Sequence, residues 1–125
     1  MIKNVKERRR YPRIDVYHLA KYRLISQPES DLITAHIKDI GGGGVCLLLN
    51  EEIPVNSTIQ IYINFPELTQ PIPCIAKIAW VKRIDKLKKY KAGVEFLEIE
   101  DIFRDIIINR IEYVREKIEK KEANK

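Results

Sequence analysis

Two short segments of the sequence carry residue types that can bind phosphate and guanine. Residues 9–13 read RRYPR, and residues 39–45 read DIGGGGV. A guanidinium group pairs bidentately with phosphate, or with the O6 and N7 atoms of guanine, and its plane can stack on a base. The carboxylate of Asp39 can accept hydrogen bonds from the N1–H and N2–H₂ edge of guanine. Glycines let the backbone approach a bulky ligand and present N–H donors to it.

The positive charge of the chain is concentrated at its N-terminus. The lysines and arginines of residues 1–13, opposed only by Glu7, account for the whole formal net charge of +5. This basic arm predicts a local anionic partner, not a surface that coats nucleic acid. Because its charges repel one another, we expect the arm to be mobile without ligand. The basic residues of 82–91 are more simply the solvated turn of a hairpin.

The hydrophobic pattern predicts a mainly β domain with a helix at its C-terminus. Alternation of apolar and polar residues indicates six strands, and their short spacing is typical of a sandwich or barrel. We expect these strands at Val16–Ser26, Leu32–Ile40, Val45–Leu49, Thr58–Phe65, Ile75–Ile84 and Tyr90–Leu97. At Gly41–Gly44 we expect a sharp turn in which glycine adopts a positive φ.

From about Glu100 the apolar residues recur with helical spacing. The stripe consists of Phe103, Ile106, Ile107, Ile111, Val114 and Ile118. Its first half should cover the β domain, whereas Ile111, Val114 and Ile118 extend beyond a domain of this size. That second half is either a frayed tail or a contact with a second subunit, and we predict a homo-oligomer formed through it.

Length and composition indicate one soluble domain without a catalytic centre. The 125 residues are 45% hydrophobic and 33% charged. No apolar run approaches the roughly 18–20 residues of a membrane span, and no secretory signal is evident, so we expect a cytoplasmic protein. Cys46 and Cys74 lack metal-ligand spacing and should be reduced core thiols. His18 and His36 are isolated, and no nucleophile–base pair or phosphate-cleaving loop is present, so we expect no enzyme, cofactor or metal.

Taken together, the two segments resemble the two-part signature of PilZ domains. That signature is an Arg-x-x-x-Arg arm before the first strand and an Asp/Asn-x-Ser-x-x-Gly turn between the second and third strands. The resemblance extends over nearly the whole chain, including residues 79–81 (AWV), residues 93–96 (GVEF) and the terminal helix. It implies a six-stranded antiparallel β-barrel at residues 15–98, a C-terminal helix at 99–125 and a flexible basic arm at 1–14. It also implies a bacterial receptor for the second messenger cyclic di-GMP that changes conformation and signals to a downstream protein.

The resemblance also implies a set of ligand-binding residues. Matching the two motifs gives Arg9, Arg13, Asp39, Gly41 and Gly44, with Arg8, Arg10 and Trp80 as further candidates. Gly41 stands where the family usually has serine, and one lost hydroxyl donor is worth about 1 kcal/mol, so we expect a loss of affinity of about tenfold or less. Trp80 either belongs to the core or stacks on a guanine at the barrel mouth.

Two alternative functions are open at this point. One is a degenerate PilZ-like domain that binds a protein partner instead of nucleotide, which Gly41 favours and the intact Arg9, Arg13 and Asp39 disfavour. The other is a small barrel that binds nucleic acid through the basic arm. That class of protein usually exposes several aromatic residues to stack bases, and a neutral body with a single tryptophan does not match it.

Overall fold

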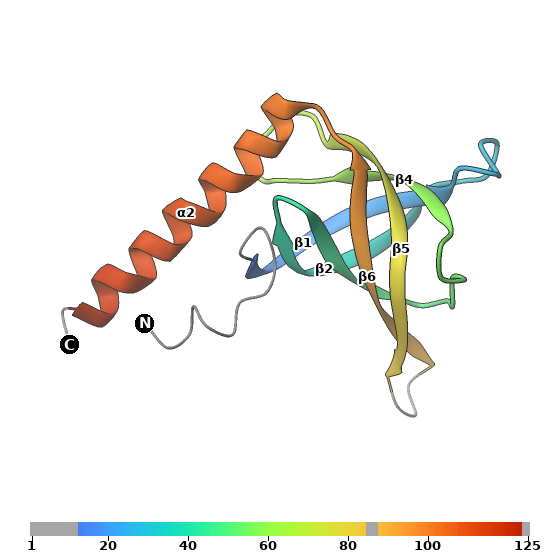
Figure 1. Cartoon of the computed structure of the whole chain (residues 1–125), viewed down its shortest axis with the longest axis horizontal. Coiled ribbons are helices and arrows are strands. Elements are labelled where there is room, and N and C mark those ends of the chain that lie inside the picture. The colour runs from blue at the N-terminus through green and yellow to red at the C-terminus, as the bar shows by residue number, and fades with distance from the viewer. Residues whose placement is uncertain (1–12, 85–87, 124–125) are drawn as a thin grey trace.

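The protein is a closed six-stranded β-barrel with one C-terminal helix (Figure 1). The computed structural model describes residues 13–84 and 88–123. Within them lie β1 (Arg13–Leu24), β2 (Ile33–Gly41), β3 (Gly44–Leu49), β4 (Thr58–Ile63), β5 (Ile72–Ile84), β6 (Lys89–Glu98) and α2 (Asp101–Ala123). Every strand pair is antiparallel, in the order β1-β2-β3-β6-β5-β4, and pairing of β1 with β4 closes the barrel. The predicted fold class is confirmed. Almost all of the predicted basic arm lies outside the described residues.

The barrel forms because alternate residues of each strand are apolar and point inward. On β4 the isoleucines Ile59, Ile61 and Ile63 are fully buried, while the residues between them are partly exposed. Their β-branched side chains suit a pleated surface that packs on one face. Closure pairs the edge strands, so the barrel leaves no open sheet edge.

Irregularities in β2 and β5 reverse which side chains face outward. On β2, Ile37 pairs with Leu47 and Asp39 with the next residue, Cys46, so Lys38 is an extra residue. On β5, Ile78 pairs with Val94 and Trp80 with Gly93, which makes Ala79 an extra residue. Such β-bulges re-aim the residues that follow them. Asp39 and Trp80 therefore point outward, although alternation counted from the buried Ile37 and Ile78 would place them inside the barrel.

Helix α2 packs on the barrel with its first half only. Ile107 is buried in the core, and Phe103 and Ile106 pack against it, as predicted for the first half. Ile111 is also buried and Val114 also packs on the core, so the expectation that these two residues extend beyond the domain is wrong. Beyond Val114 the apolar side chain of Ile118 is 50% exposed. Figure 1 shows the C-terminal half of α2 running away from the barrel. Of the helices in the described part of the chain, none is long and apolar enough to cross a membrane.

Candidate functional site

The strand register brings the end of the arginine motif beside the glycine motif. Gly42 and Gly43 form the turn between β2 and β3, and Gly41 and Gly44 are register partners across it. On the other side of β2, Arg13 is the register partner of Gly41. The last residue of RRYPR thus lies one strand away from the glycine turn. Arg8, Arg9 and Arg10 lie outside the described residues.

Two neighbouring rows of paired residues cross the sheet at this place. Residues paired directly across strands lie on the same face, so each row can be followed from strand to strand. The first row is Gly41, Gly44, Glu95 and Lys77, and the second is Asp39, Cys46, Gly93 and Trp80. On β1 the backbone register partners of Gly41 and Asp39 are Arg13 and Asp15. By strand alternation Cys46 points away from its core neighbours Val45 and Leu47, although it is itself only 3% exposed.

The centre of these two rows has almost no side chains. It consists of Gly41, Gly44, Gly93 and the small side chain of Cys46, which we call the glycine platform. Asp39 flanks the platform on β2, and Trp80 flanks it on β5. These four residues are buried, and their lack of large side chains would let a planar base that reaches them lie close to the backbone, with a carboxylate and an indole on either side of it.

Gly44 is required by the close approach of β3 to β6. An added Cβ atom would overlap the carbonyl oxygen of Val94 and would lie 3.2 Å from the Cα atom of Glu95. The expectation of a positive φ in this turn is wrong, because none of the described glycines has one. Space between strands, not backbone conformation, is the reason for glycine at this position.

Trp80 lies on the outer surface over the backbone of Gly93. Its side chain is 43% exposed, so the alternative that it belongs to the core is wrong. An added Cβ atom at Gly93 would overlap the indole ring, so this glycine makes room for the tryptophan. The ring is covered from the sheet side and remains accessible from solvent, a geometry that suits stacking on a base.

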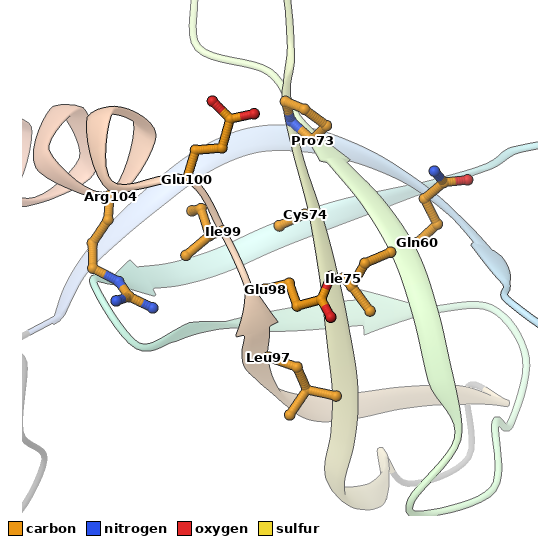
Figure 2. Close-up of a pocket in the computed structure, with 9 residues that line it drawn as sticks. All are labelled: Gln60, Pro73, Cys74, Ile75, Leu97, Glu98, Ile99, Glu100 and Arg104. Carbon is orange, nitrogen blue, oxygen red and sulfur yellow. The ribbon is translucent and has the colours of Figure 1, made fainter.

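The glycine turn is held from behind by α2 and β6. The Nε–H of Arg104 donates to the carbonyl oxygen of Gly42 at 3.1 Å, and the backbone N–H of Phe96 donates to that of Gly43 at 2.9 Å. Figure 2 shows the Arg104 side chain leaving the first turn of α2 toward this turn. Sequence reasoning missed Arg104, because outside the apolar stripe of the helix it resembled any solvated residue.

A separate hollow of about 560 Å³ lies where β5 and β6 meet the start of α2. Figure 2 shows Gln60, Cys74, Glu98 and Arg104 among its lining residues. Burial raises the pKa of the Cys74 thiol to about 12, so it stays protonated and unreactive at neutral pH. The hollow contains Arg104 but neither Asp39 nor Trp80.

The histidines and cysteines of the described residues do not form a reactive centre. His18 packs edge-on against Phe65, with ring centroids 5.3 Å apart. Burial, assisted by the positive charge of Arg110, lowers the pKa of His18, while the charge of Glu67 acts in the opposite direction. Cys46 and Cys74 are buried and form no disulfide, and residues 13–84 and 88–123 contain no group of His, Cys, Asp and Glu suited to a metal ion.

The sequence and the fold both match known proteins. The family model of the PilZ domain matches residues 7–113. No curated protein sequence matches the chain significantly. Among solved structures, the Bacillus subtilis inhibitor of motility (MotI/DgrA) superposes with a TM-score of 0.74 and 19% identity, over 91% of this chain and 53% of its own.

The PilZ domain of Escherichia coli YcgR with c-di-GMP gives a TM-score of 0.65 and 18% identity, over 95% of this chain and 99% of its own. A longer YcgR structure in complex with c-di-GMP gives a TM-score of 0.70 and 19% identity, over 94% and 50%. The chain therefore spans about half the length of MotI/DgrA and of the longer YcgR structure. At these identities the likeness shows a common fold.

Proposed function

Because the chain belongs to the PilZ domain family, we propose that it is a receptor for cyclic di-GMP and binds this ligand over the glycine platform. The observation that carries the proposal is the register of β1, which pairs Arg13 with Gly41. It brings the arginine segment to the glycine turn that the second motif forms. Solved structures of YcgR and of Klebsiella MrkH, which share this fold, contain c-di-GMP.

Each residue of the proposed site has a distinct role. Arg9 and Arg13, with Arg8 or Arg10 in support, pair with phosphate or with the O6 and N7 atoms of guanine. Asp39 accepts from the N1–H and N2–H₂ groups of a guanine, which an amide or hydroxyl does less well. Gly41 and Gly44 let the ligand approach the backbone, and the exposed indole of Trp80 stacks on a base.

The proposed receptor signals by ordering its arm. A basic arm whose charges repel one another becomes ordered when the phosphates of the ligand neutralise them, and this shifts the population toward a single conformation. A downstream protein then recognises the ordered arm together with the neighbouring barrel surface. No step of this scheme requires bond making or breaking, so we propose a sensor without catalytic activity.

Calorimetric titration with cyclic di-GMP, with GTP and cyclic di-AMP as controls, tests the proposal. Arg13→Ala should weaken binding by about 2 kcal/mol, the value of a charge-assisted hydrogen bond, with little change in thermal stability. Lys82→Ala, which removes a positive charge from the exposed end of β5, serves as the matched control and should bind as the wild type does.

Three results would contradict the proposal. The first is undiminished binding by the Arg9→Ala, Arg13→Ala double variant. The second is no binding of cyclic di-GMP by the wild-type chain, which would favour the protein-interaction alternative. The third is binding of single-stranded nucleic acid with the steep salt dependence of many phosphate contacts, which would favour the nucleic-acid alternative.

A further inference from the structure

We infer that Arg104 is a positioning residue, which turns the backbone N–H of Gly43 toward the cyclic di-GMP site as a substitute for the missing serine hydroxyl. The inference rests on the proposed function and concerns how the same site obtains a donor. Its starting point is the hydrogen bond from Arg104 Nε to the Gly42 carbonyl oxygen at 3.1 Å, which joins residues 62 positions apart.

Peptide geometry connects this bond to a donor on the other side of the turn. In a trans peptide the carbonyl of one residue and the N–H of the next point in opposite directions. No cis peptide occurs in the described parts of the chain, so the Gly43 N–H points away from the carbonyl that Arg104 holds. Arg104 belongs to α2, which packs on the core through Ile107 and Ile111. The Gly43 N–H is therefore directed away from the Arg104 side chain, and the inferred role of Arg104 requires that it face the glycine platform.

A second hydrogen bond stabilises the same orientation. The N–H of Phe96 on β6 donates to the carbonyl oxygen of Gly43 at 2.9 Å. Both carbonyls of the turn are thus engaged, and neither peptide plane can rotate without breaking a bond. This matters for a run of four glycines, because glycine loses more backbone entropy on ordering than any other residue. Holding the turn before the ligand arrives lowers that cost at binding.

The position of Gly41 explains why such a device is useful in this chain. Serine, the usual residue at this place in the family signature, would offer a hydroxyl donor, and Gly41 offers none. A backbone N–H at the turn, held in place from behind, supplies a donor within two residues of it. Gly43 is only half-buried, so its N–H remains within reach of a ligand.

A double-mutant cycle measured by calorimetry with cyclic di-GMP tests the inference. Arg104→Met should weaken binding about tenfold, equivalent to about 1.4 kcal/mol. Gly41→Ser should tighten binding by a factor of a few, because it restores a hydroxyl donor and its backbone has no positive φ that serine would avoid. In the Gly41→Ser background, Arg104→Met should cost about threefold or less, since the hydroxyl then replaces the N–H.

Arg110→Met is the matched control for charge. It removes an arginine from the same helix, but the Arg110 guanidinium binds Glu67 at 2.7 Å on the surface and is not bonded to the turn. Its affinity should equal that of the wild type. A further measurement needs no variant: the Gly43 amide proton should shift downfield in the NMR spectrum of the wild-type chain when cyclic di-GMP is added, as expected for a new hydrogen bond.

The outcomes separate this inference from the proposed function. If the wild-type chain does not bind cyclic di-GMP, the proposed function is wrong and the inference falls with it. If the wild-type chain binds and Arg104→Met binds equally well, Arg104 has no positioning role. Equal losses from Arg104→Met in the wild-type and Gly41→Ser backgrounds, or an unshifted Gly43 amide, would likewise overturn the inference and leave the receptor function standing.

Discussion

Replacing Gly44 by alanine should destabilise the barrel more than any other single methyl group added to the glycine platform. The new Cβ atom would overlap the carbonyl oxygen of Val94, 3.1 Å from the carbon of the same carbonyl and 3.2 Å from the Cα atom of Glu95. All three atoms belong to the backbone of β6, so no side-chain rotation relieves the overlap. Strand β3 has to move away from β6 along a pairing that runs from Gly44 to Leu49.

The expected size of the effect follows from two opposing terms. Overpacking costs about 1–3 kcal/mol, and a backbone obstacle should bring the cost to the upper end. Alanine lowers the entropy of the unfolded chain, which returns about 0.5–1 kcal/mol. The net loss in the free energy of unfolding is about 2 kcal/mol, which for a chain of 125 residues lowers Tm by about 8 °C.

Differential scanning calorimetry of Gly44→Ala and Gly93→Ala provides the test and its control. At Gly93 the obstacle is the indole of Trp80, a partly exposed side chain that can swing outward. We therefore expect Gly93→Ala to cost about 1 kcal/mol or less but to change the tryptophan emission. Equal Tm values for Gly44→Ala and the wild type would refute the reasoning from strand spacing.

Three further predictions concern the ligand, pH and assembly. Saturating cyclic di-GMP should change the fluorescence emission of Trp80, the single tryptophan. Trp80→Ala should weaken binding at least about fivefold, as expected for the loss of one base–aromatic stack. Unchanged emission and affinity would exclude stacking. Because burial raises the pKa of Cys74 from 9.0 to about 12, the folded state keeps a proton that the unfolded state loses above pH 9. The stability that Cys74 contributes is thus complete below pH 9 and falls as pH rises toward 12. In urea denaturation, the difference in free energy of unfolding between the wild type and Cys74→Ala should therefore become smaller from about pH 8 to about pH 10.5. A difference that does not change with pH would contradict this. Light scattering at high micromolar concentration should detect a homo-oligomer that Ile118→Glu dissociates. A wild-type chain that is monomeric with and without nucleotide would rule out this oligomer. Truncation at Asn109 is a poorer test because it also removes the buried Ile111.

The strands and the helix could be predicted because their hydrophobic period is regular over most of their length. The isoleucines of β4 alternate without a break, and the stripe of α2 keeps helical spacing from Phe103 to Ile118. In such segments burial of one face dominates the free energy, and the pattern records which face is buried.

The orientation of the site residues could not be predicted in the same way. Asp39 and Trp80 each follow a bulge, and a single extra residue reverses the facing of all residues after it. Alternation counted from Ile78 places Trp80 in the core, whereas the bulge at Ala79 places it outside. Arg104 has no local signal at all, since its role depends on a turn 62 residues earlier in the chain. The two motifs could be found from the sequence, but their juxtaposition depends on the register of β1.

The hydrogen bond between Arg104 and Gly42 also connects α2 directly to the glycine turn. The helix of 23 residues is about 34 Å long, and only its first half rests on the barrel. Residues 115–123, which extend beyond the packed part, are about 14 Å long, so a rotation of about 5° would displace their far end by about 1 Å relative to Val114. If cyclic di-GMP binding displaces the glycine turn, the bond to Gly42 would pass the displacement to α2, whose protruding half (Figure 1) would present it to a downstream partner.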